Sequence, residues 1–194
     1  MQDEASQIAS SKVAVQPGEH FLDYCAGSGG KTLAIAPGMQ GKGQIYLHDI
    51  RPRALVEAKK RLKRAGIENA QIVEPDKLSH KKLEGKMDWV LVDVPCSGSG
   101  TLRRNPDMKW KFDPKELQAT IELQREIFDK ALRFVKKGGH IVYATCSVFP
   151  AENKEQIDYF LSLYPMLKAK GPDFVSYPSS GGMDGFYSAL LQKC

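Results

Sequence analysis

The sequence lacks several patterns that would place it in a common class of protein. No apolar run is long enough to span a bilayer, and the first residues do not form a signal-peptide pattern. There is no internal repeat and no low-complexity segment. We therefore expect a cytoplasmic, globular chain with no membrane contact, folded as a single domain over residues 1–194.

Cysteine is scarce and widely spaced. The four positions include no Cys-x-x-Cys pair, so neither a zinc site nor any other metal site is expected. A disulfide framework is also not typical of a chain of 194 residues without a secretion signal. An isolated cysteine is most often a small buried apolar residue, which is what we expect of Cys25 and Cys194.

The chain has little net charge, but its cations are unevenly distributed. A formal charge of +5 is explained by a solvated surface as well as by a ligand. Five cations crowd one helix-like segment, where a solvated face is the ordinary outcome: Lys59, Lys60, Arg61, Lys63 and Arg64. Four more follow Cys96 in a loop, where contact with nucleic-acid phosphates is the better interpretation: Arg103, Arg104, Lys109 and Lys111.

Strand-like and helix-like segments alternate, which predicts an α/β fold with a mostly parallel sheet covered by helices. The strand-like segments are His20–Tyr24, Gln44–His48, Ala70–Val73, Asp88–Val92, Ile141–Thr145 and, more weakly, Phe174–Tyr177 and Phe186–Leu191. The helix-like segments are 4–12, Gly30–Ala36, Pro52–Ala65, Asp113–Val135 and Pro150–Leu163. Lys136, Lys137 and Gly138 are expected to close the long helix.

A glycine-rich turn over Cys25–Lys31 follows the first predicted strand. It ends like a phosphate-binding P-loop, but that spacing needs glycine where Cys25 stands. The other interpretation is a Rossmann-like turn, in which glycines let the backbone approach a nucleotide-containing ligand. Asp49 ends the second predicted strand, 19 residues after Gly30, where such folds place a carboxylate on the ribose. A plain tight turn with a solvated Asp49 is the structural alternative.

Two further acids follow strand-like segments. Asp76 lies just past the third predicted strand, where it could approach an adenosine, although alone it would be an ordinary loop acid. Asp93 ends the most hydrophobic strand, where a carboxylate is costly without a partner. At the carboxyl edge of an open parallel sheet that partner is expected to be a ligand.

Cys96 and Cys146 each follow the carboxyl end of a predicted strand. A free thiol has a pKa of about 8.5 and needs help to act as a nucleophile at neutral pH. Either cysteine alone would more often be structural. Two thiols converging near a nucleotide-binding turn favour covalent chemistry beside an adenosine-containing cofactor.

These motifs resemble the catalytic domain of the Sun-type RNA (cytosine-5) methyltransferases over essentially the whole chain. The segments that carry the resemblance are Gln2–Gln7, Asp23–Thr32, Asp93–Thr101, Arg103–Asp107, Tyr143–Ser147, Pro150–Asn153 and Gly182–Phe186. The pair of Pro95-Cys96 and Thr145-Cys146 is the most specific part. Two departures stand out: Gly27-Ser28 replaces the family's frequent Ala-Pro, and the RNA-binding region that usually precedes the Gln2 segment is not seen.

The resemblance implies a Rossmann-like class I methyltransferase with helices on both faces of the sheet and S-adenosylmethionine as cofactor. It assigns cofactor contacts to the turn and to three acids: Cys25, Ala26, Gly27, Ser28, Gly29, Gly30, Lys31, Asp49, Asp76 and Asp93. It makes Cys146 the nucleophile and Cys96 the thiol that assists release. Asp93 is expected to hydrogen-bond the target cytosine as well.

The resemblance thus implies a monomeric enzyme that methylates carbon 5 of cytosine in structured RNA, with ribosomal RNA favoured over transfer RNA. One alternative is a catalytically silent RNA-binding module on the same fold. Another is a methyltransferase that acts on small molecules. Incorporation of labelled methyl groups into RNA separates the three.

Overall fold

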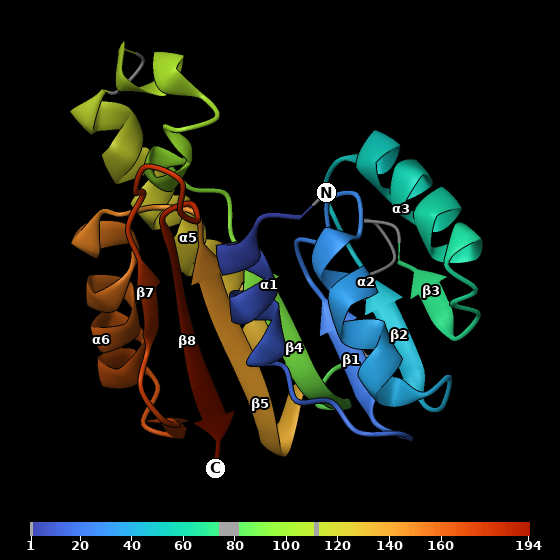
Figure 1. The fold of residues 1–194 in the computed structure, drawn as a ribbon. Coiled ribbons are helices and arrows are strands. Elements are labelled where there is room, and N and C mark those ends of the chain that lie inside the picture. The colour runs from blue at the N-terminus through green and yellow to red at the C-terminus, as the bar shows by residue number, and fades with distance from the viewer. Residues whose placement is uncertain (1, 74–81, 111–112) are drawn as a thin grey trace.

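A single sheet organises the molecule (Figure 1). The computed structural model describes residues 2–73, 82–110 and 113–194. Within them eight strands pair in the order β3-β2-β1-β4-β5-β8-β6, and β7 pairs with β8. The strands are β1 (His20–Asp23), β2 (Gln44–Leu47), β3 (Ala70–Ile72), β4 (Met87–Asp93), β5 (Val135–Thr145), β6 (Leu167–Ala169), β7 (Phe174–Ser176) and β8 (Phe186–Lys193).

The first five strands run parallel, and the last three are antiparallel to their neighbours. The chain winds outward from β1 through β2 to β3, then returns to place β4 on the other side of β1. Such a reversal opens a crevice at the carboxyl ends of the two central strands. The predicted mostly parallel α/β architecture is confirmed.

Helices cover both faces of the sheet (Figure 1). The described α-helices are α1 (Glu4–Ser11), α2 (Gly30–Ile35), α3 (Pro52–Arg64), α5 (Pro114–Leu132) and α6 (Lys154–Leu163). Short 3-10 helices are η1 (Ala36–Met39), η2 (Ser99–Thr101), η3 (Pro106–Trp110) and η4 (Pro150–Glu152). No described helix combines the length and apolar character that a membrane span needs.

Alternation along β1 separates the two largest apolar clusters of the core. Phe21 and Leu22 are neighbours in β1, but their side chains point to opposite faces and join different apolar clusters. The cluster around Leu22 includes Phe128 of α5 stacked on Phe160 of α6, with 3.8 Å between ring centroids. The cluster around Phe21 includes residues of α2, η1 and α3. Apolar clusters therefore pack on both faces of β1 and β4. The candidate active site lies at the carboxyl ends of these strands.

Two expectations for local structure are wrong, and one strand is not predicted. The long helix ends at Leu132, and Lys136–Gly138 belong to β5, where the register against β4 shifts between Met87 and Trp89. Gly138 takes a φ of 81° there, which a glycine adopts without strain, so the chain bulges and then resumes pairing. The expected helix over 150–163 is interrupted at Asn153, and β6 was not anticipated.

Candidate active site

The two thiols predicted to converge lie in contact. Cys146 directly follows β5, and Cys96 lies three residues beyond β4. These strands are parallel neighbours, with Asp93 paired to Ala144, so their carboxyl ends deliver both cysteines to one place. The sulfur atoms are 3.3 Å apart, and both thiols are free.

The contact between the sulfurs makes them chemically different. Hydrogen bonding to Cys96 lowers the pKa of Cys146, whereas the same contact together with burial raises the pKa of Cys96 well above its usual value. The Lys31 ammonium also favours the Cys146 thiolate, against the opposing effects of burial and Asp93. The two thiols therefore differ, with the lower pKa at Cys146 and the higher at Cys96, and the lower pKa favours the thiolate form of Cys146.

Lys31 and Asp93 form an ion pair beside the thiols. Burial alone would lower the pKa of Lys31, but the Asp93 carboxylate raises it above its ordinary value. The ammonium also lies 5.0 Å from the centre of the Phe186 ring. The partner that Asp93 requires is therefore supplied by the chain, through a lysine of the glycine turn.

A cavity of about 690 Å³ joins the glycine turn to the thiols. Its lining includes Cys25–Ser28, Gly30, Lys31, Asp49, Asp93, Cys96 and Cys146. Gly29 is the exception among the predicted turn residues: it has a φ of 76° and approaches Ala58 of α3, where a Cβ would lie 3.3 Å from the Ala58 Cβ. A larger hollow of about 1200 Å³ lies along α3 and β3, but neither thiol lines it.

Asp49 connects the end of β2 to the glycine turn. It lies two residues beyond β2, and its Oδ2 accepts a hydrogen bond of 2.8 Å from the Gly27 N–H. Its Oδ1 accepts one of 2.9 Å from Arg51 Nε. Burial opposes the charge, yet these hydrogen bonds from Arg51 and Gly27 lower the pKa of Asp49. The carboxylate is therefore held ionised at the cavity wall.

Asp23, at the end of β1, was not singled out from the sequence. It is 1% exposed, and burial raises its pKa to about 7. The Thr32 hydroxyl donates to Oδ2 at 2.6 Å, whereas Oδ1 has no hydrogen-bond partner among the residues that the structure describes. Because Asp23 lines the cavity, that orphaned oxygen is a ready acceptor for a ligand.

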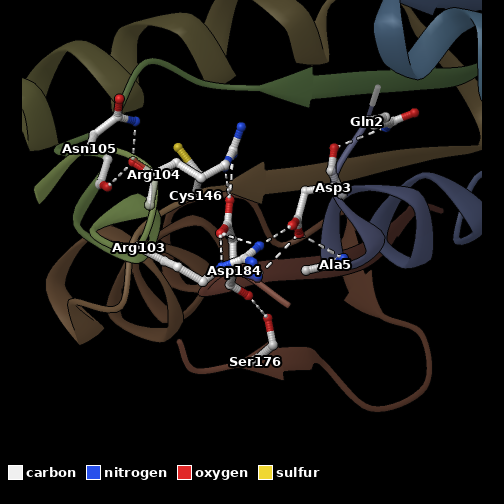
Figure 2. Close-up of polar contacts among 12 residues, drawn as sticks. Gln2, Asp3, Ala5, Arg103, Arg104, Asn105, Cys146, Ser176 and Asp184 are labelled. Atoms are coloured by element: carbon white, nitrogen blue, oxygen red, sulfur yellow. Dashed lines mark hydrogen bonds and ion pairs between the residues drawn. The ribbon is translucent and has the colours of Figure 1, made fainter. Parts of the chain in front are cut away.

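The segment after Cys96 that carries Arg103, Arg104, Lys109 and Lys111 is called the basic loop below. Its two arginines are paired within the protein (Figure 2). Arg104 Nε donates to Asp184 Oδ2 at 2.6 Å, and Arg103 Nη2 lies 3.3 Å from both Asp184 Oδ1 and Asp3 Oδ2. Asp184 is 1% exposed, whereas the two arginine side chains are 43% and 54% exposed. These pairs tie the loop after Cys96 to the segment before β8, and they leave about half of each arginine side chain facing solvent.

The structure places three of the remaining predicted residues and does not describe the other two. The Lys109 ammonium lies 4.9 Å from the centre of the exposed Trp110 ring. Asp76 and Lys111 lie outside the described residues. Cys194 is exposed, so its expected burial is wrong: it follows the last strand at the surface. Cys25 is only partly buried and lines the cavity.

The solvated face expected of α3 is confirmed for Lys59, Lys60, Lys63 and Arg64, which are exposed. Arg61 differs, because it donates to the Ser28 carbonyl at 2.9 Å and so supports the glycine turn. Among the described residues, no cluster of histidine, cysteine or acidic side chains could hold a metal ion.

The strand order and the superposition on solved structures define the class: a Rossmann-like methyltransferase fold. Residues 11–192 match the model of the family described as 16S rRNA methyltransferase RsmB/F, and the chain belongs to that family.

Individual relatives agree with this assignment. The chain is 38% identical over 200 aligned residues to the ribosomal RNA small subunit methyltransferase B of Vibrio cholerae, covering all of this chain and 46% of that protein. A crystal structure of PH0851 superposes with a TM-score of 0.92 at 35% identity, over 100% of this chain and 46% of that one. NSun6 from Pyrococcus horikoshii, solved with SFG, gives 0.84 at 25% identity, over 99% and 52%. The chain spans less than half the length of the curated relatives it matches.

Proposed function

We propose that this chain is the catalytic part of a cytoplasmic, monomeric enzyme that transfers a methyl group from S-adenosylmethionine to carbon 5 of cytosine in structured RNA. Ribosomal RNA is favoured over transfer RNA, in keeping with the family. The observation that carries the proposal is the contact of 3.3 Å between Cys96 and Cys146 at the wall of the cavity. A silent RNA-binding module would have no use for two thiols whose pKa values are shifted in opposite directions.

The thiols divide the chemistry between them. Cytosine carbon 5 is a poor nucleophile until the Cys146 thiolate adds to carbon 6, which makes the ring enamine-like. When bound, S-adenosylmethionine supplies an electrophilic methyl group that carbon 5 can take. Loss of the carbon-5 proton to a base then allows the bond between carbon 6 and sulfur to break. Cys96 assists by donating its S–H to the departing Cys146 sulfur.

Lys31 and Asp93 are placed to orient the base during these steps. Their ion pair lies at the cavity wall between the glycine turn and the thiols. A carboxylate there can accept a hydrogen bond from the cytosine amino group, and an ammonium can donate to a ring acceptor. Because each holds the other, neither must reorganise when the base arrives.

The hydrogen-bonding groups that line the cavity match those of S-adenosylmethionine. Asp23 Oδ1 is a buried acceptor in need of a donor, which the amino group of a methionine moiety supplies. The Asp49 carboxylate is ionised and stands where Rossmann-like folds hold a ribose. The turn over Cys25–Lys31 provides close backbone approach at Gly27, which has a φ of 53°.

RNA is expected to dock along the loop that follows Cys96. The side chains of Arg103 and Arg104 are about half exposed, and Lys109 lies beside an exposed tryptophan ring on which a base can stack. The target cytosine must leave its stack to reach the thiols, which costs less in RNA loops than in a duplex.

The deciding experiment is transfer of tritiated methyl groups from S-adenosylmethionine into total RNA, followed by mapping of the labelled position. We expect 5-methylcytosine in ribosomal RNA and none with Cys146→Ala. Label that enters only small molecules would favour the alternative methyltransferase, and binding of RNA without any transfer would favour the silent module.

A further inference from the structure

Cys96 is held by hydrogen bonds to the residues on both sides of it. The Pro95 carbonyl accepts from Gln124 Nε2 at 3.1 Å. The Ser97 N–H donates to Glu152 Oε1 at 2.8 Å, and the Ser97 hydroxyl donates to Glu152 Oε2 at 2.5 Å. Gln124 Nε2 also donates to Glu152 Oε1 at 2.9 Å, which closes the set. The backbone on both sides of Cys96 is thus held by the side chains of Gln124 and Glu152, which are both 0% exposed.

Cys146 is held in the same manner by the residue that follows Glu152. Asn153 Oδ1 accepts from the Thr145 hydroxyl at 2.5 Å, and Asn153 Nδ2 donates to the Ser147 carbonyl at 2.9 Å. One amide side chain therefore contacts the residues before and after Cys146. Asn153 is 6% exposed, so these contacts are shielded from water.

Glu152 and Asn153 form one rigid unit between η4 and α6. Tyr143 Oη donates to the Glu152 carbonyl at 2.7 Å, and Gln156 Nε2 donates to Gln124 Oε1 at 2.9 Å. The break in the helix at Asn153, with φ −117° and ψ −105°, lets two consecutive side chains serve different loops. A continuous helix would fix neighbouring side chains about 100° apart, whereas the break leaves their directions independent of that spacing.

We propose that Glu152 and Asn153 are positioning residues that keep the two sulfur atoms in contact. Glu152 acts through the backbone around Cys96, and Asn153 acts through the backbone around Cys146. This inference rests on the proposed two-thiol mechanism. Neither side chain touches the substrate. Their function is to keep the sulfurs at a separation at which Cys96 can donate to Cys146.

Thiol reactivity without RNA gives the first test. Alkylation by iodoacetamide is followed against pH, with each cysteine resolved by mass spectrometry. In the wild type we expect Cys146 to react with a midpoint below that of an unperturbed thiol, because the contact with Cys96 lowers its pKa. Glu152→Ala and Asn153→Ala should both raise that midpoint, because either change releases one side of the sulfur contact.

Two further variants separate positioning from general loss of stability. Glu152→Gln should stay close to the wild type, since its amide oxygen can accept from Ser97 and Gln124 while its NH₂ donates to the Ser97 hydroxyl. Tyr164→Phe removes a hydrogen bond of 2.8 Å to Asp129 at the far end of α6 and should leave the midpoint unchanged. A Cys146 midpoint that is the same in Glu152→Ala, Asn153→Ala and wild type would overturn the proposal.

RNA adducts on denaturing gels give the second test. Glu152→Ala should accumulate a protein–RNA adduct several-fold, as a weakened form of Cys96→Ala. Asn153→Ala should form several-fold less adduct, as a weakened form of Cys146→Ala. Equal losses in both variants would indicate general destabilisation and refute the assignment. Shifted alkylation midpoints with no adduct from Cys96→Ala would contradict the proposed function while supporting the positioning role.

Discussion

Cys146 and Cys96 should fail in different ways when each is removed. Cys146→Ala should abolish turnover and form no covalent complex, because addition to carbon 6 requires its thiolate. Cys96→Ala should still attack, though more slowly near neutral pH, because it removes the hydrogen bond that lowers the pKa of Cys146. Release should suffer more, so a protein–RNA adduct should accumulate on denaturing gels with labelled RNA. An adduct with Cys146→Ala but none with Cys96→Ala would reverse the two roles.

Asp49 should matter for the cofactor. Asp49→Ala should weaken S-adenosylmethionine binding by about 1.5–3 kcal/mol, the usual contribution of a hydrogen bond to a charged group. Titration calorimetry measures this directly. Asp88→Ala is the matched control, since Asp88 lies at the opposite end of β4 and accepts from the His20 N–H at 2.8 Å. Unchanged affinity in Asp49→Ala would rule out the ribose contact.

Asp23 should give the fold a measurable pH dependence. Its pKa is about 7 in the folded chain, against an ordinary value of 3.8. Between these values the unfolded chain releases a proton that the folded chain retains, so stability should fall as pH rises from about 4 to about 7 and then level off. Urea unfolding at several pH values should show the wild type losing stability relative to Asp23→Asn across this window. A constant difference between the two proteins would contradict the assignment.

At the scale of elements, the loop carrying η2 packs against two neighbouring segments without room for a side chain. The Gly100 N–H donates to the Cys146 carbonyl at 2.9 Å, and the Gly185 N–H donates to the Gly100 carbonyl at 2.8 Å. A Cβ on Gly100 would lie 2.1 Å from the Gly185 oxygen. Gly100→Ala should therefore destabilise the fold by roughly 1–3 kcal/mol.

Urea unfolding tests the packing of this loop. Gly30→Ala is the control, because Gly30 opens α2 and no atom lies within 4 Å of an added Cβ. If Gly100→Ala unfolds at the same urea concentration as the wild type, the loop is not packed as described.

Helices and strands could be predicted from the sequence where a local hydrophobic pattern determines them. Hydrophobic runs located β1, β4 and β5, and the parallel arrangement then required Cys96 and Cys146 to meet at one edge. Contacts between distant segments were not predictable. The pairing of Arg104 with Asp184 joins residues 80 apart, and nothing in the basic loop indicates its partner.

The same limit explains the residues that were missed. Burial of Asp23 and Glu152 depends on how helices cover the carboxyl edge, which no local pattern encodes. The segment Pro150–Asn153 carries part of the resemblance to the family, but no local pattern in it indicates that Glu152 and Asn153 contact different loops. The bulge at Gly138 likewise arises from pairing with β4 and not from the helix-ending residues themselves.

At the scale of the whole molecule, the two apolar clusters fix the central strands from both sides and leave chemistry to the loops at one edge. The glycine turn, the thiols and the basic loop all follow carboxyl ends of strands, and the loop is tied back through Asp184 to the segment before β8 (Figure 2). Cofactor and RNA should therefore bind to adjoining but separable surfaces.

Neutralising the basic loop should weaken RNA binding without changing cofactor affinity. Charge-neutral substitutions at Arg103, Arg104, Lys109 and Lys111 should each lower the dependence of log affinity on log salt, by roughly 0.7 for each phosphate of single-stranded RNA that is no longer neutralised.

Lys109→Gln gives the cleanest variant, because the Lys109 ammonium lies against the exposed Trp110 ring, whereas Arg103 and Arg104 also anchor the loop to Asp184. Lys59→Gln on the exposed face of α3 is the matched control. Filter binding across a salt series measures the slope, and calorimetry measures the cofactor. An identical slope in Lys109→Gln and Lys59→Gln would place the RNA elsewhere on the surface.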